Sequence, residues 1–344
     1  MTRSPSATRA GVFPVADKDD AAREDKAVRD CLLQTPPRLP AWFGYDATGS
    51  ELFEQITELP TYYLTRVERA LLERNASEIA EVLGCGQIAE LGSGSAKKTR
   101  LLLQHCVRLR KTTYVPIDVD REMLRSSGAA LCSELTHLKV KGLWGRYEAG
   151  LDWLRTHARE PLAVAFLGSN VGNATREERD TLLSEIARTL GPGGSFLVSA
   201  DLDKSREVLE TCYNDPAGRS AFADFRLNYL TRLNRRYGAG FVLDDFIPEA
   251  HYNADTSTVE GRLRAQADRT ISIPRLGLTL RIRHGQSLNV GYSAKFDGQR
   301  LVDEIGAHGF NLRAQWRDSQ AQYGLFLFRR HAACSRPRPT FTSP

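Results

Sequence analysis

The 344-residue sequence lacks the features that mark several common classes of protein. Its six cysteines are scattered, without a CxxC motif or a histidine at metal-ligand spacing, so neither a disulfide framework nor a metal site is predicted. No apolar run approaches the roughly 20 residues that cross a bilayer. The N-terminus has no apolar segment of a secretory signal, although a transit peptide stays an alternative. We therefore expect a cytoplasmic protein without a membrane partner.

A dense basic tract is also missing. The chain has 47 Lys and Arg against 42 Asp and Glu, a net charge of +5, and the two signs are interleaved throughout. The closest approach to a tract is RLNRR at 232–236, and such short runs are usually solvated helix faces. We therefore expect no nucleic-acid partner.

What the sequence does contain is QIAELGSGS at 87–95, followed by YVPIDVD at 114–120. An apolar strand ends at Glu90 and enters a glycine loop, and a second strand ends at Asp118. Gly92 and Gly94 allow a ligand to approach the backbone, and Asp118 can accept hydrogen bonds from both ribose hydroxyls. The third glycine of a dinucleotide loop is missing. An acid directly before the loop instead suits the cationic end of S-adenosylmethionine. The alternative is an ordinary strand-to-helix turn.

Helical and strand patterns alternate from residue 67 to 200 and predict a parallel, doubly wound α/β sheet. Residues 202–265 read as mostly helical, and short strands follow between 270 and 295. Two further strands are expected over 310–316 and 323–329. We therefore expect disordered tails over 1–27 and 331–344, a Rossmann-like core over 65–201 and 295–330, and an inserted α+β lobe over 28–64 and 202–294 that covers the ligand cleft.

Polar groups follow the strand predicted over 162–167, at the carboxyl edge of the sheet where ligands bind. Gly168 and Asn173 can present backbone and amide groups to a small polar substrate. Asn173 also suits the N-cap of the next helix. Tyr45 and Tyr62 lie in loops, where a tyrosine usually packs with a satisfied hydroxyl but can also bind an amine or a carboxylate. No Ser-His-Asp arrangement is visible, so hydrolytic chemistry is not expected.

Together these motifs resemble the histidine-specific Nα-methyltransferases of ergothioneine biosynthesis, a group that also contains fungal enzymes that N-methylate dimethylallyltryptophan. The resemblance spans roughly residues 28–330. The matching stretches are WFGYDATGSELF (42–53), LPTYYLTR (59–66), LGSGSAKKTR (91–100), DVD (118–120), FLGSNVGNAT (166–175), YNDPAG (213–218) and SAKF (293–296).

The resemblance implies a Rossmann-like class I methyltransferase fold and methyl transfer from S-adenosylmethionine to the α-amine of a free amino acid. A neutral amine would face the methyl group in line, at roughly 3–3.5 Å. Tyr45 and Tyr62 would be the catalytic hydroxyls, although solvent could equally accept the proton. The resemblance and the loop motifs together give the cofactor residues Tyr45, Glu90, Gly92, Gly94, Lys98, Asp118 and Tyr147, and the substrate residues Tyr62, Gly168, Asn173, Tyr213, Gly261, Gly291 and Ser293.

Three positions depart from the family pattern. Gly291 stands where histidine-specific members have the glutamate that pairs with imidazole, and Gly261 stands where they have a methionine. Both changes should widen the substrate pocket or give the space to neighbours such as Tyr292. Arg146 replaces the acid of an acidic-aromatic pair that contacts adenine, while its aromatic partner is kept as Tyr147. How adenine is recognised is therefore open.

The sequence thus predicts a monomeric N-methyltransferase that acts on an amino acid other than histidine, in specialised metabolism. The predicted substrate has a larger or differently polar side chain, such as that of an aromatic or modified amino acid. Three alternatives stay open: a true histidine Nα-methyltransferase, a methyltransferase of peptides or nucleic acids, and a non-catalytic binding protein.

Overall fold

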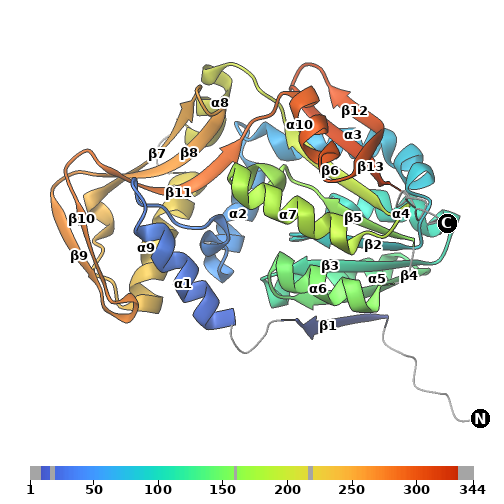
Figure 1. The fold of residues 1–344 in the computed structure, drawn as a ribbon, viewed down its shortest axis with the longest axis horizontal. Coiled ribbons are helices and arrows are strands. Elements are labelled where there is room, and N and C mark those ends of the chain that lie inside the picture. The colour runs from blue at the N-terminus through green and yellow to red at the C-terminus, as the bar shows by residue number, and fades with distance from the viewer. Residues whose placement is uncertain (1–8, 16–19, 159–160, 216–219, 332–344) are drawn as a thin grey trace, which may run out of the picture.

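The structure, a computed structural model, describes residues 9–15, 20–158, 161–215 and 220–331. Its centre is an eight-stranded sheet in the order β1-β4-β3-β2-β5-β6-β13-β12 (Figure 1). The first six strands of that order are parallel, and β13 lies antiparallel between β6 and β12. The strands are β1 (Ala10–Pro14), β2 (Gln87–Leu91), β3 (Thr112–Asp118), β4 (Leu138–Trp144), β5 (Leu162–Phe166), β6 (Ser195–Asp201), β12 (Phe310–Asp318) and β13 (Tyr323–Arg330).

Helices cover both faces of this sheet (Figure 1). Along each strand successive side chains point to opposite faces, so that Tyr114 packs with one set of helices and Val115 with the other. The first set is α3 (Tyr63–Leu83), α4 (Thr99–Leu109) and α5 (Arg121–Glu134), and the second is α6 (Tyr147–His157), α7 (Arg176–Thr189) and α10 (Gly298–Gly306). Strands β5 and β6 are buried along their whole length, as expected for continuous apolar strands at the centre of a parallel sheet. The predicted Rossmann-like class is confirmed.

The chain order places a switch point between β2 and β5. From β2 the chain proceeds to β3 and β4 on one side, and it returns to β5 and β6 on the other. Connections therefore diverge at the carboxyl ends of β2 and β5, which opens a crevice for a ligand at this edge of the sheet. The glycine loop follows β2, and the segment that begins at Gly168 follows β5.

A second group of elements lies beside the carboxyl edge of the sheet (Figure 1). It contains a three-stranded sheet in the order β11-β8-β7 and the pair β10-β9. Val28, Phe43 and Leu39 pack there with Tyr229, which shows that the N-terminal segment joins this core. The members are α1 (Asp20–Leu32), η1 (Ala41–Gly44), α2 (Ala47–Glu58), α8 (Arg206–Asn214), α9 (Ala221–Tyr237), β7 (Phe246–Asn253), β8 (Thr258–Ala265), β9 (Arg269–Ile273), β10 (Leu278–Ile282) and β11 (Ser287–Ala294).

Two expectations from the sequence are wrong. Residues 1–27 are not a tail where the structure describes them, because β1 pairs with β4 at the edge of the large sheet and α1 begins at Asp20. Residues 246–265 are not helical but form the hairpin of β7 and β8. There the buried positions Val259, Gly261, Leu263 and Ala265 recur every second residue, which is the period of a strand.

Other predicted segments lie partly outside the described residues. These are residues 1–8 and 16–19 of the N-terminal tail, 332–344 of the C-terminal tail, and the last three residues of the YNDPAG motif. Within the described ranges, no helix is long and apolar enough to cross a membrane. The same ranges contain no cluster of three His, Cys, Asp or Glu side chains that could hold a metal ion.

Candidate active site

Two adjoining cavities open at the carboxyl edge of the large sheet. The larger, of about 280 Å³, lies between the glycine loop, the end of β3, the start of α6 and the segment 40–54. The smaller, of about 90 Å³, lies between α9, β8, β11 and the segment after β5. Five residues line both cavities and form a shared wall: Ala41, Tyr45, Phe53, Asn170 and Asn173. The two cavities therefore adjoin at these residues.

The glycine loop forms one side of the larger cavity. Gly92 has φ +69° and Gly94 has φ +48°, a backbone region that favours glycine. A Cβ at Gly92 would come within 2.6 Å of the Tyr147 hydroxyl, whereas a Cβ at Gly94 would meet open space. The Gly94 N–H donates to Asp118 Oδ2 at 2.8 Å. Loop and carboxylate are thus held together beside the cavity, as the sequence predicted.

Asp118 is the acid at the tip of β3. Its Oδ1 accepts a hydrogen bond from the Asp120 N–H at 3.0 Å, and its side chain lines the larger cavity. Burial raises the pKa of this carboxyl group, while the backbone hydrogen bond from Gly94 opposes that rise. A carboxylate in this position can accept further hydrogen bonds from vicinal hydroxyl groups, so it suits a ribose.

The far end of the larger cavity is closed by a contact between the two groups of elements. The Arg146 guanidinium lies 4.6 Å from the centre of the Trp42 ring and pairs with Glu148 at 3.2 Å. Trp42, Arg146, Tyr147 and Glu148 all line this cavity. The cavity therefore combines the aromatic rings of Trp42 and Tyr147 with the carboxylate of Glu148. Glu148 lies two residues after Arg146, which stands where the family has its acid. A purine base with an exocyclic amine fits these groups.

Two predicted cofactor residues line neither cavity. Glu90 faces the α3 and α4 side of the sheet, where it accepts hydrogen bonds from Thr99 Oγ1 at 2.7 Å and from the Tyr114 hydroxyl. Burial raises the pKa of Glu90 to about 7. Lys98 pairs with Glu68, whose other oxygen accepts a hydrogen bond from the Gly168 N–H at 2.7 Å. These side chains hold the loops after β2 and β5 behind the cavity.

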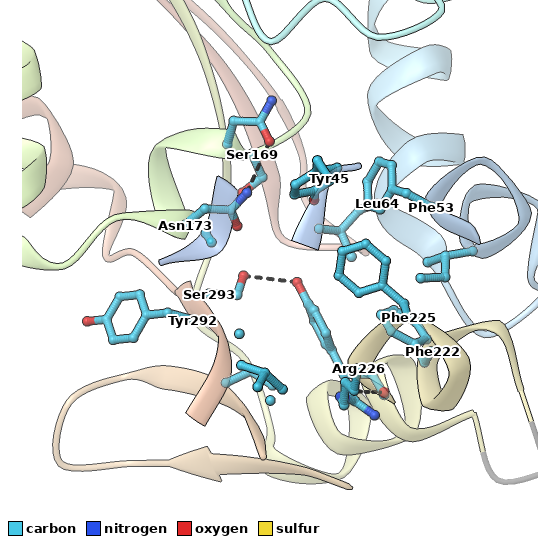
Figure 2. A pocket seen from close by; sticks show the side chains of 18 of the residues that line it. Tyr45, Phe53, Leu64, Ser169, Asn173, Phe222, Phe225, Arg226, Tyr292 and Ser293 are labelled. Atoms are coloured by element: carbon cyan, nitrogen blue, oxygen red, sulfur yellow. Dashed lines mark hydrogen bonds between the residues drawn. The ribbon is translucent and has the colours of Figure 1, made fainter. Parts of the chain in front are cut away.

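Aromatic rings form much of the smaller cavity (Figure 2). Tyr45 makes edge contacts with Phe53 at 5.5 Å and with Phe225 at 5.3 Å, and Tyr62 makes one with Tyr213 at 6.1 Å. Burial raises the pKa of Tyr45 and of Tyr62 above the usual value of 10. Both hydroxyls therefore stay protonated near neutral pH and can orient a substrate but not remove its proton.

A network of buried charged side chains lies behind another wall of the smaller cavity, the one formed by Tyr213 and Ser293. The Tyr213 hydroxyl and Ser293 Oγ lie 3.0 Å apart, and Lys295 Nζ donates to both, at 2.9 and 3.0 Å (the Tyr213–Ser293 contact is drawn in Figure 2). Lys295 also pairs with Asp201 at 2.8 Å, and both side chains are fully buried. Burial opposes the charge on Lys295, but Asp201 outweighs it and raises the lysine pKa. A cation thus lies directly behind two hydroxyls that face the cavity.

Gly168 and Asn173 lie at the junction of the two cavities. Gly168 has φ +79° and lines the smaller cavity, and Asn173 lines both. The Asn173 amide donates to Asn170 Oδ1 at 3.1 Å. The alternative role of Asn173 as a helix cap is wrong, because Thr175 caps α7 in a capping box with Glu178. The Asn173 side chain is therefore left to face the cavities.

The two glycines that depart from the family pattern face one another. Gly261 on β8 pairs with Gly291 on β11, and both line the smaller cavity. A Cβ on Gly261 would lie 3.3 Å from the Nε of Arg226, a residue of α9 that also lines this cavity. Sequence reasoning missed Arg226. Its spacing in FADFRLNYL could have indicated its burial. Arg226 follows Phe222 by four residues and precedes Tyr229 by three, so all three lie on the buried side of the helix.

Sequence reasoning also missed four other residues of the cleft. Trp42 closes the larger cavity, and Phe53 and Asn170 belong to the shared wall. Phe225 faces the smaller cavity from α9. The motifs at 42–53 and 166–175 contained three of these positions, but nothing in the sequence ranked them above their neighbours.

Sheet order, the antiparallel β13, the glycine loop and the acid at the tip of β3 define the class I methyltransferases that use S-adenosylmethionine. The chain belongs to one family within that class. A profile of the family described as "Histidine-specific methyltransferase, SAM-dependent" matches residues 23–330.

Named relatives support this assignment. The chain is 37% identical over 311 residues to a histidine N-alpha-methyltransferase of Mycolicibacterium smegmatis, covering 90% of this chain and 94% of that protein. It is 35% identical over 299 residues to the protein of that name from Mycobacterium tuberculosis, covering 86% and 91%. It is 25% identical over 334 residues to an L-tryptophan methyltransferase of Psilocybe serbica, covering 88% and 92%. The relatives thus differ in the amino acid that their names give.

Proposed function

We propose that this enzyme methylates the α-amine of an amino acid other than histidine. The observation that carries the proposal is the Gly261–Gly291 pair in the smaller cavity. Histidine recognition in the family pattern relies on a glutamate at the position of Gly291, and glycine offers no group to imidazole. We further propose that the enzyme acts as a monomer.

The larger cavity is proposed to hold S-adenosylmethionine, which supplies a methyl group activated by its sulfonium charge. Asp118 would accept hydrogen bonds from the ribose hydroxyls, with the Gly92–Gly94 loop alongside. Tyr147 and Trp42 would contact adenine, and Glu148 would take the place of the missing acid as acceptor for its amine. Tyr45, on the shared wall, would lie at the end nearest the substrate.

The smaller cavity is proposed to hold the amino acid. Tyr62 and Asn173 would bind its amine, and the Tyr213 and Ser293 hydroxyls, backed by Lys295, would bind its α-carboxylate. Only a neutral amine has the free electron pair that the transfer needs. The positive charges of Lys295 and Arg226 disfavour an ammonium group nearby, which promotes loss of its proton to solvent. Tyr45 and Tyr62 would fix the direction of the electron pair.

A direct test is incubation of the purified enzyme and S-adenosylmethionine with a pooled amino-acid extract, followed by mass spectrometry. We expect an amino acid that gains one or more methyl groups on its α-nitrogen. Calorimetric titration with S-adenosylhomocysteine serves as the control for cofactor binding. If the product analogue binds and no amino acid is methylated, the proposal fails. A salt-dependent interaction with peptide or nucleic acid would then favour the other acceptors.

Exclusion of histidine has its own test. Titration of the twenty amino acids, each with S-adenosylhomocysteine present, should place histidine below the best ligand by ten- to a hundredfold. The reason is that a lost hydrogen bond between imidazole and a carboxylate costs about 1.5–3 kcal/mol. Histidine as the tightest ligand would instead support a true histidine Nα-methyltransferase. If S-adenosylhomocysteine does not bind at millimolar concentration, the chain is a non-catalytic relative.

A further inference from the structure

No carboxylate in the described part of the chain forms an ion pair with the buried guanidinium of Arg226. Its side chain is on α9, and the residue is 4% exposed. Among the described residues its one hydrogen bond runs from Nη2 to the main-chain oxygen of Tyr213, at 2.6 Å (Figure 2). Its flat face lies 5.3 Å from the centre of the Phe222 ring. Glu249 acts on it electrostatically, but the Glu249 carboxylate is bonded to Arg264 at 3.1 Å.

The remaining donors of Arg226 lie next to the space that the two glycines open. Nε is 3.3 Å from where a Cβ on Gly261 would be, and Gly291 is the cross-strand partner of Gly261. None of these three residues lines the larger cavity or belongs to the shared wall. They therefore face the part of the substrate that lies farther from the transferred methyl group.

Positive charges also gather behind the Tyr213 and Ser293 hydroxyls. Asp201 accepts hydrogen bonds from Lys295 at 2.8 Å and from Lys204 at 2.5 Å, so two cations already share one carboxylate. Burial lowers the pKa of Arg226 to about 10, which still leaves it charged at neutral pH. A buried cation without a counter-ion is costly, and an anion that reaches it would remove that cost.

We propose that the substrate is an acidic amino acid whose side chain ends in a carboxylate or another anion that Arg226 binds. This inference rests on the proposed function. A guanidinium presents parallel N–H donors, and such a fork matches the two oxygens of a carboxylate. The hydrogens of Gly261 and Gly291 leave the space through which the acidic side chain reaches it.

The α-carboxylate is a weaker candidate for the same site. Tyr213 and Ser293 already place two hydroxyls in the cavity, and both accept hydrogen bonds from Lys295. These groups can bind one carboxylate without Arg226. Two cationic regions, one behind Tyr213 and one beside the glycine pair, therefore fit a substrate with two anionic groups.

The test is a titration of matched amino acids with S-adenosylhomocysteine present. Glutamate, aspartate and O-phosphoserine are the acidic ligands, and glutamine and asparagine are their neutral controls. We expect at least one acidic ligand to bind about ten- to a hundredfold more tightly than its neutral control. Comparison of glutamate with O-phosphoserine separates a carboxylate from a phosphate. The same ligands are then assayed for N-methylation by mass spectrometry.

Two variants assign the effect to Arg226. Arg226→Met should remove the preference for acidic ligands while leaving the affinity for S-adenosylhomocysteine unchanged, and Arg226→Lys should keep part of the preference. Gly291→Glu should also remove it, because the new carboxylate occupies the space and pairs with Arg226. Gly291→Gln is the control of equal size, and it should weaken all ligands to a similar degree.

Three results would overturn the inference. If the enzyme binds neutral amino acids more tightly than acidic ones while it still binds S-adenosylhomocysteine, the inference is wrong but the proposed function is not contradicted. An equal loss of acidic and neutral ligands in Arg226→Met would show that Arg226 binds the α-carboxylate instead. Failure of every amino acid to bind, with S-adenosylhomocysteine bound, overturns both this inference and the proposed function.

Discussion

At the scale of single residues, Glu90 is a carboxyl group kept from solvent inside the sheet. Burial raises its pKa from 4.5 to about 7, although the hydrogen bonds from Thr99 and Tyr114 act to lower it. Between these two pH values the folded protein holds a proton that the unfolded chain releases. The resulting stability is fully present below pH 4.5 and is lost as pH rises through 7.

Glu90→Gln should abolish this dependence on pH. From pH 4.5 to 8 the free energy of unfolding of the unmodified protein should fall by up to about 3 kcal/mol relative to the variant. Urea denaturation of both proteins across this range measures the difference. A difference that stays constant with pH would show that folding does not raise the pKa of Glu90.

Asp118 is the residue on which cofactor affinity should depend most directly. Asp118→Asn keeps an oxygen for the Gly94 N–H but loses the charge that strengthens hydrogen bonds to hydroxyl groups. We expect affinity for S-adenosylhomocysteine to fall about ten- to a hundredfold in calorimetry. Asp297→Asn, at a carboxylate that caps α10 away from both cavities, is the matched control. Equal affinities of Asp118→Asn and the control would remove Asp118 from the site.

The candidate site divides into residues that sequence could and could not predict. Gly92, Gly94 and Asp118 were predictable because their conformation and chemistry belong to local motifs beside strand ends. The role of Arg226 was not predictable, because it depends on Glu249 being paired with Arg264 and on two glycines more than thirty residues further along the chain. Glu90 was assigned to the cofactor, yet alternation along β2 turns it to the other side.

At the scale of elements, Asp201 and Lys295 connect β6 of the large sheet with the end of β11. Lys295→Met would leave the buried Asp201 carboxylate with Lys204 and the Tyr63 hydroxyl alone. Because Lys204 still pairs with Asp201, we expect the free energy of unfolding to fall by only about 1–3 kcal/mol, the cost of the hydrogen bonds that Lys295 makes. Urea denaturation with intrinsic fluorescence measures this change.

The double variant Asp201→Asn/Lys295→Met provides the control for that substitution. It also removes the carboxylate with which the buried Lys204 pairs, so it should be less stable than the single variant. If the single variant is as stable as the unmodified protein, then Lys204 alone compensates Asp201. The connection would then matter only for the Tyr213 and Ser293 hydroxyls.

Apart from β1, the strands of the large sheet were predictable to within a few residues, whereas the hairpin of β7 and β8 was not. In the sheet, apolar strands alternate with amphipathic helices, and the two periods differ clearly. In β7 and β8 only one face is buried, and charged residues such as Glu249 and Arg264 alternate with it. Charged residues also occur along exposed helix faces, so this pattern was mistaken for a helix. The strict alternation of Val259, Leu263 and Ala265 with Glu260, Arg262 and Arg264 is nevertheless a strand signal that the sequence contains.

At the scale of the whole molecule, the larger cavity has walls from both groups of elements. The segment 40–54 contributes Trp42, and the large sheet contributes Asp118 and Tyr147. Binding of S-adenosylhomocysteine should therefore change the fluorescence of Trp42, and Trp42→Phe should abolish most of this change. At a ligand concentration of 100 Kd the folded state should gain about 2.7 kcal/mol, measured by urea denaturation. An unchanged signal in both proteins would place the ligand away from Trp42.

The position of β13 has a consequence for synthesis of the chain. This strand, residues 323–330, fills the place between β6 and β12, and Arg329 on it donates to the main-chain oxygen of Val82 at the end of α3. A ribosome must therefore release almost the entire described chain before the sheet can close. Until then the apolar edge of β6 stays open to pairing with other strands. Pairing of β13 with β6 is therefore the step that protects this edge from aggregation.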